Sequence, residues 1–234
     1  MARQRKQMTP RLPEPTRIQR FRHKLLRWFE ENARTFPWRR PNQPTYRLVI
    51  TEILLQRTRA ETVATFYAEF FRTFASWRKL AAARNRELER FLRPLGLWRR
   101  RAAVLVGLAT AVHKRRGRLP VSREEIEQLP GVGQYIANAI QLVQWHVRSP
   151  LLDVNMARVL ERYFGPRRLA DIRYDPYLQK LARTVVDSND ALRLNWAILD
   201  LAAMICRKRS PRCPVCPLRL SCNYARGVSR ARDD

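Results

Sequence analysis

The stretch LPGVGQYIANAI, residues 129–140, decides the fold. It predicts a helix that ends at Pro130, a tight turn containing Gly131 and Gly133, and a second helix with an apolar face. Glycine lets the backbone approach a ligand closely, and the N–H groups at a helix start attract an anion such as a DNA phosphate. A plain interhelical turn has the same sequence pattern, so the function of this one depends on the residues around it.

The rest of the sequence predicts an all-α protein. Its 234 residues include only 7 Gly, and the apolar positions recur mostly at helical spacing. Ser122 and Glu125 have the spacing of a capping box. The longest apolar run has 11 residues (102–112), against the roughly 20 that a membrane span needs. Helices are expected at about 18–32, 46–58, 61–75, 86–93, 99–113, 122–129, 154–164, 176–186 and 191–205, with a proline-containing linker at 36–45.

The charge balance indicates a polyanionic partner. Lys and Arg total 47 and Asp and Glu total 20, which gives a formal charge of +27. Arg accounts for 41 of the 47, and its planar set of donors matches phosphate groups and guanine edges. GC-rich coding would give the same excess of Arg.

A hydrophobic content of 45% excludes a disordered basic tail. The basic N-terminus has no apolar core of the kind that a secretory signal needs, so an intracellular location is expected.

All four cysteines lie near the C-terminus in the pattern C-x6-C-x2-C-x5-C: Cys206, Cys213, Cys216 and Cys222. Such a group in a reducing compartment indicates a metal centre. Zinc ribbons usually pair two CxxC sequences, and only one occurs here. Three prolines within the segment favour a loop around an iron–sulphur cluster, although the spacing leaves zinc open.

Two carboxylates stand out. Glu52 falls among apolar residues in the expected 46–58 helix, where it either pairs with an arginine or has a functional role. Asp153 precedes the expected 154–164 helix, where it is a good N-cap. The two roles are compatible, because an anionic carboxylate near a sugar also stabilises an oxocarbenium-like transition state.

Together, LPGVGQY, Asp153 and the four cysteines resemble the endonuclease III superfamily of DNA glycosylases, over about residues 36–224. The resemblance implies a six-helix domain with a helix-hairpin-helix at 37–147. It also implies a second helical domain, formed by 17–36 and 148–234, in which the cysteines hold a [4Fe–4S] cluster. A base pocket is expected between the two domains, and residues 1–16 are expected to form a flexible basic arm.

The branches of the superfamily differ at one hairpin position. Bifunctional members have a Schiff-base lysine where this sequence has Tyr135, and a phenol cannot form an imine. MutY-type adenine glycosylases share Glu52 but usually have a small residue at that position and an extra C-terminal domain. The archaeal-type G·T and G·U mismatch glycosylases combine the glutamate, the tyrosine, the aspartate and the cluster, and this sequence resembles them most.

The resemblance implies a monofunctional glycosylase that flips thymine or uracil out of a mismatch with guanine and hydrolyses its N-glycosyl bond. Asp153 would stabilise the sugar cation, Tyr135 would contact the flipped base, and Glu52 would position water or contact the base.

The alternative functions are those of an adenine glycosylase and of a non-catalytic DNA-binding protein. The expected partner is mismatched duplex DNA, bound by a monomer with no membrane association. The expected DNA-binding residues are Gly131, Gly133, Gln134, Gln56, Arg57, Leu97 and Trp98, although core packing explains Trp98 equally well.

Overall fold

The computed structural model describes residues 11–227. The regular secondary structure of these residues consists of helices, with no β-strand among them, which confirms the predicted all-α class. Most of the expected arm, residues 1–16, lies outside the described residues. None of the helices described is both long and apolar enough to cross a membrane. The helices are α1 (Pro15–Asn32), α2 (Thr45–Leu55), α3 (Ala60–Thr73), α4 (Trp77–Ala81), α5 (Asn85–Leu92), α6 (Trp98–Lys114), α7 (Arg123–Glu127), α8 (Gln134–Gln144), α9 (Val154–Phe164), α10 (Pro176–Val186) and α11 (Ala191–Met204), and the short 3-10 turns are η1 (Pro37–Arg39), η2 (Arg93–Leu95), η3 (Cys213–Val215) and η4 (Arg219–Ser221).

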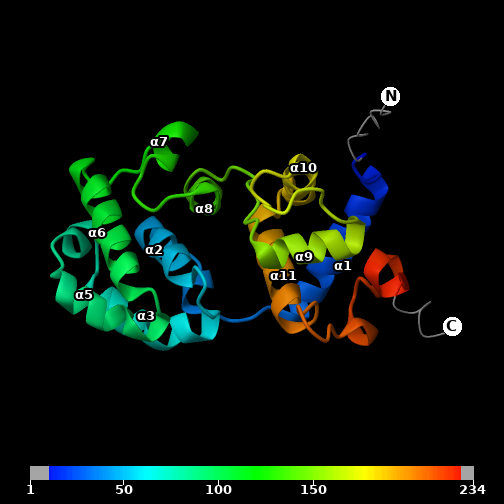
Figure 1. The fold of residues 1–234 in the computed structure, drawn as a ribbon, viewed down its shortest axis with the longest axis horizontal. Coiled ribbons are helices and arrows are strands. Elements are labelled where there is room, and N and C mark those ends of the chain that lie inside the picture. The colour runs from blue at the N-terminus through cyan, green and yellow to red at the C-terminus, as the bar shows by residue number, and fades with distance from the viewer. Residues whose placement is uncertain (1–10, 228–234) are drawn as a thin grey trace, which may run out of the picture. The chain divides into compact units, whose positions relative to one another are not determined.

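The chain forms two compact units. The first comprises Met1–Arg34 and Arg148–Asp234, so it is built from both ends of the sequence, and the second is Thr35–Val147. In the second unit, α6 packs against α4 and α5, and α2 packs against α8 (Figure 1). Helix α2 is central to its core, because its apolar side chains Val49, Ile50, Ile53 and Leu54 are at most 1% exposed. This packing positions the hairpin helix α8.

The first unit is a separate helical bundle in which α9 packs against α10 and α11, and α1 packs against α11 (Figure 1). An aromatic cluster joins α1 to α9. The ring of Phe21 lies 4.9 Å from that of Tyr163 and 5.2 Å from that of Phe164, between centroids. These three side chains are almost fully buried, and their burial supplies much of the apolar stabilisation between the N-terminal helix and the C-terminal half.

Two local expectations were wrong, and one helix was missed. The segment 36–45 is no simple linker, because Phe36 and Trp38 are buried in the core and stack with centroids 4.7 Å apart. The helix expected at 46–58 ends at Leu55, because Arg57 has a φ of 57°, which a right-handed helix cannot include. Helix α4 was not expected, because its five residues are too few to show a periodicity.

Arginine side chains fasten the ends of several helices. The last carbonyl groups of a helix have no partner within the helix, and a guanidinium supplies several donors to them. Arg17 of α1 donates to the carbonyl of Tyr163 near the end of α9 (2.6 Å), and Arg22 donates to that of Val185 near the end of α10 (2.9 Å). Arg158 of α9 donates to the carbonyl of Ala202 near the end of α11 (3.1 Å). These contacts join α1 to α9 and α10, and α9 to α11, within the first unit.

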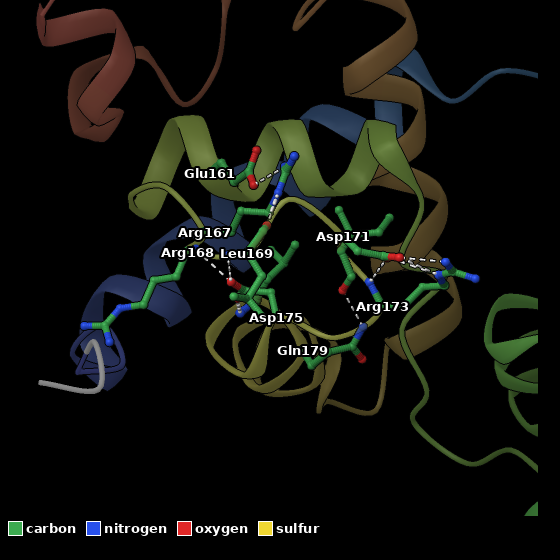
Figure 2. Close-up of polar contacts among 10 residues, drawn as sticks. Glu161, Arg167, Arg168, Leu169, Asp171, Arg173, Asp175 and Gln179 are labelled. Carbon is green, nitrogen blue, oxygen red and sulfur yellow. Dashed lines mark hydrogen bonds and ion pairs between the residues drawn. The ribbon is translucent and has the colours of Figure 1, made fainter. Parts of the chain in front are cut away.

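A buried aspartate organises the loop between α9 and α10. Figure 2 shows that Asp175 accepts hydrogen bonds from the backbone N–H groups of Arg168 and Leu169, both 2.7 Å long. Its other oxygen caps α10 by accepting from Leu178 N–H (2.7 Å). Burial alone would raise the pKa of Asp175, but these three hydrogen bonds together outweigh burial and lower that pKa. The ionised carboxylate therefore stabilises the folded loop.

Replacing Asp175 by Asn should destabilise the chain by about 2–4 kcal/mol, because an amide NH2 would face N–H donors that now share a carboxylate oxygen. The pKa of Asp175 is lower in the folded chain than the roughly 3.9 of an unfolded aspartate. Its stabilisation is thus complete above about pH 4 and is lost as the pH falls through the folded pKa. Urea unfolding between pH 2 and 7 should show this component in the parent and not in D175N.

Asp171 provides the matched control, because it lies in the same loop but is partly exposed, and its carboxylate binds only Arg173 (Figure 2). D171N should unfold at the same urea concentration as the parent at pH 7. Equal unfolding midpoints for D175N and D171N would contradict the organising role of Asp175.

Candidate functional site

The predicted helix-hairpin-helix is formed by α7, the turn at residues 128–133 and α8. Ser122 caps α7 by accepting a hydrogen bond from Glu125 N–H (3.2 Å), which is half of the predicted capping box. Arg123 at the start of α7 donates to the side chains of Asn138 (2.6 Å) and Gln141 (2.8 Å) on α8. These bonds set the position of one hairpin helix against the other.

The glycines of the turn have different roles. Gly131 has a φ of 72°, and a Cβ built there would lie 2.1 Å from Cγ1 of Val104 on α6. Gly133 precedes α8 and has open space around it. Both glycines are exposed, as is required of a turn whose backbone approaches a phosphate. Gln134, the first residue of α8, is half-buried beside them.

Two of the predicted catalytic residues lie together in the second unit. The hydroxyl of Tyr135 on α8 donates a hydrogen bond to Oε2 of Glu52 on α2, at 3.0 Å. Both side chains are half-buried. The contact follows from the packing of α2 against α8, and it fixes the orientation of the phenol. The pair therefore presents a carboxylate and a phenol side by side, a combination that can bind a polar edge or orient a water.

Asp153 lies in the first unit and is the N-cap of α9. Its Oδ1 accepts hydrogen bonds from the backbone N–H groups of Asn155 (2.9 Å) and Met156 (2.8 Å). Its Oδ2 accepts from the side-chain amide of Asn155 (2.6 Å). The carboxylate is half-buried, and the next residue, Val154, is 67% exposed. Asp153 is thus rigidly oriented by the helix start and remains accessible.

Four of the predicted DNA-binding residues lie in two turns of the second unit. Gln56 and Arg57 follow α2 and are exposed. Leu97 precedes α6, is 55% exposed and has a φ of 48°. Trp98 is half-buried against the core and has the guanidinium of Arg99 over its ring at 4.2 Å. Of the two adjacent candidates, Leu97 is therefore the one that projects into solvent.

The four cysteines lie in the loop after α11 and are all half-buried. Burial raises the pKa of the Cys216 thiol to about 11, and the other three cysteines are close enough to contribute electrostatically to that value. Arg162 lies beside them, with Nη1 3.5 Å from the sulfur of Cys206. Within residues 11–227, no three Cys, His, Asp or Glu side chains are placed to share a single metal ion.

Sequence reasoning missed Arg123 and Asn155. Asn155 donates to Asp153 and accepts from Arg158 (3.0 Å), so it links the candidate carboxylate to the end of α11. An Asn two residues after an N-cap aspartate is a recognisable local signal. Arg123 had no such signal, because its partners on α8 come together with it only in the folded hairpin.

Comparison with known proteins identifies the family. The profile described as HhH-GPD superfamily base excision DNA repair protein matches residues 50–183, which include the hairpin, Glu52 and Asp153. The chain belongs to this superfamily. It is accordingly a member of the DNA glycosylases, which are hydrolases of N-glycosyl bonds.

Individual HhH-GPD proteins are similar over almost the whole chain. The thymine-DNA glycosylase of Aeropyrum pernix is 38% identical over 89% of this chain and 95% of its own length. The adenine DNA glycosylase of Buchnera aphidicola is 31% identical over 86% of this chain, which spans 57% of that protein. The solved structure of a thermostable thymine-DNA glycosylase is 31% identical, covers 91% of this chain and 98% of its own, and superposes with a TM-score of 0.83. The endonuclease III fold is also shared, at 22% identity and a TM-score of 0.79.

Replacing Gly131 by Ala should destabilise the HhH-GPD protein by about 2–5 kcal/mol, because a Cβ would meet Val104 at a backbone φ that L-residues rarely adopt. Gly133→Ala is the matched control: it adds the same methyl group to the same turn, at a φ of −97° and with no atom within 4 Å. Thermal unfolding should separate the two variants by several degrees. A G131A protein as stable as G133A would show that the turn and α6 are not packed as described.

Proposed function

We propose that this glycosylase excises thymine or uracil mispaired with guanine from duplex DNA, acting as a monomer. The observation that carries the proposal is the pair formed by Tyr135 and Glu52, within a chain that is 38% identical to a thymine-DNA glycosylase over 89% of its length. A mispaired base is easier to extrude than a paired one, so weak pairing contributes to the choice of substrate.

Tyr135 supports hydrolysis without strand cleavage. Lyase activity of the Schiff-base type needs an amine, and a phenol cannot form an imine with the sugar aldehyde. The Tyr135 hydroxyl is held by Glu52 at 3.0 Å, so it is oriented for contact with a base edge. We assign Tyr135 and Glu52 to recognition of the flipped base, with Glu52 also able to orient the attacking water.

We assign Asp153 to stabilising the positive charge that develops on the sugar as the N-glycosyl bond breaks. Its three hydrogen bonds at the start of α9 hold the carboxylate in one orientation, and its partial exposure lets a nucleotide reach it. The exposed hairpin glycines Gly131 and Gly133 would bind a phosphate through backbone N–H groups, which positions DNA without reading its sequence.

The cysteines fit a [4Fe–4S] cluster, which we propose as the resident cofactor with a structural role. Four half-buried thiols gather in one loop, and such a cluster takes one thiolate from each of four cysteines. The thiols therefore need to surround the cluster rather than converge on one ion. Arg162 would stabilise the thiolate of Cys206, and the exposed run Arg207–Arg209 would present cations to DNA.

Labelled duplexes with G·T, G·U, G·A and 8-oxoguanine·A pairs test the function, each read with and without hot alkali. We expect the G·T and G·U strands to break only after alkali. D153N should lose at least about 100-fold in excision while duplex binding persists, because Asn also caps helices but carries no charge. Release of adenine instead would make the chain an adenine glycosylase, and no release of any base would support a DNA-binding protein without catalysis.

The cofactor has its own test. Protein purified without oxygen should be yellow-brown, contain about four iron and four sulphide per chain, and lose the colour in a C213S/C216S variant. Arg219→Ser, in the same loop but not a ligand, is the control that should keep the colour. Colourless protein with stoichiometric zinc would overturn the cluster assignment.

A further inference from the structure

The guanidinium of Arg101 joins two turns of the second unit. Arg101 lies in the first turns of α6 and is only 6% exposed. Its Nη2 donates to the carbonyl of Gln56 (2.6 Å) and to the hydroxyl of Thr58 (3.1 Å). Its Nη1 donates to the carbonyls of Leu95 and Gly96, both at 3.2 Å. One side chain thus fastens residues 56–58 to residues 95–96.

Each of these turns contains an exposed, non-glycine residue with a left-handed backbone. Arg57 has a φ of 57° and Leu97 a φ of 48°. Such conformations are uncommon for L-residues, persist only where the surroundings hold them, and gather at functional sites. The side chain of Leu97 is 55% exposed on a chain with a formal charge of +27. An apolar side chain on a cationic protein is suited to insertion into a DNA base stack from which a nucleotide has been extruded.

The carbonyls that Arg101 binds are the ones that define both turns. Gln56 is the residue after α2, which carries Glu52, and Gly96 precedes Leu97 directly. Without the guanidinium, four acceptors at the two turns would each lose a donor. Burial lowers the pKa of Arg101, because desolvation disfavours the charged form. The guanidinium is held in place by its four hydrogen bonds to acceptors in the two turns. A lysine would bring three donors on one atom and could not span both turns in the same way.

We propose that Arg101 is a positioning residue that fixes the spacing between the turn of Gln56 and Arg57 and the turn of Gly96 and Leu97. With that spacing fixed, the two turns enter a DNA duplex together and fill the space that an extruded nucleotide leaves. The proposal rests on the proposed function, because only an enzyme that extrudes a nucleotide needs this space filled. It adds a residue that makes no contact with DNA itself.

The test uses the full chain with three variants: R101M, R101K and R22M. Arg22 is the matched control, because it also donates to backbone carbonyls, at the end of α10 in the other unit. The readout is the ratio of two dissociation constants, for an intact duplex and for the same duplex with a tetrahydrofuran abasic analogue. This ratio measures filling of a vacated space and needs no excision.

We expect the parent and R22M to prefer the abasic duplex by at least tenfold, R101M to lose most of that preference, and R101K to recover part of it. Affinity for the intact duplex should change less than threefold, and thermal unfolding should show that R22M and R101K are folded. A parent without preference for the abasic duplex, or R101M and R101K proteins that keep it, would overturn the proposal.

Excision from G·T and G·U duplexes, measured on the same proteins, keeps the two proposals apart. If the parent releases neither thymine nor uracil, the proposed substrate is wrong, and the binding ratio still decides the role of Arg101. If the parent excises uracil, R101M should lose at least tenfold more activity on duplex than on single-stranded uracil DNA, where no stack has to be filled. Equal losses on both would indicate a merely structural role and overturn the proposal.

Discussion

The interaction on which the structure most depends is the hydrogen bond from an arginine guanidinium to a backbone carbonyl at the end of a helix. Helix ends are abundant in an all-α chain of short helices, and each leaves carbonyl groups that need donors. Arg17, Arg22 and Arg158 supply them in the first unit, and Arg101 does so at the end of α2 in the second. A guanidinium is suited to this role because it stays charged and its donors reach several carbonyls at once. The carbonyl groups at the helix C-termini are therefore the sites at which arginines join elements that are distant in sequence.

This use of arginine changes how the composition is interpreted. An excess of Arg indicates nucleic acid only to the extent that the guanidinium groups are exposed and not engaged with the protein itself. Arg101 is almost fully buried, whereas Arg207 and Arg209 beside Cys206 are exposed. Buried guanidinium groups such as that of Arg101 hold the fold together, whereas exposed ones such as those of Arg207 and Arg209 remain available to bind phosphate. Net charge predicts that a partner is anionic, but the structure is needed to locate the charges that meet it.

The helices and the motifs were predictable because both depend on local sequence. The hairpin turn and the cap of α9 each lie within a dozen residues, and apolar spacing gives most helix bounds to within a few residues. The burial of Phe36 and Trp38 was not predictable, because it depends on packing against distant helices such as α3. The bond between Tyr135 and Glu52 joins residues 83 positions apart, so each could be proposed from the sequence but not their contact. Arg101 gave no signal, since its partners are backbone carbonyls, which every residue has.

Two aspartates show how burial separates a structural carboxylate from a candidate catalytic one. Asp153 and Asp175 each cap a helix and each accept three hydrogen bonds, so capping geometry alone does not distinguish them. Asp175 is completely buried, and its oxygens are surrounded by the loop that they organise. Asp153 is only half-buried, and one of its three donors is a side-chain amide rather than the backbone. A nucleotide could therefore approach Asp153 without unfolding the chain, whereas at Asp175 it could not. The same helix-start chemistry serves stability where it is closed to solvent and can serve catalysis where it is open.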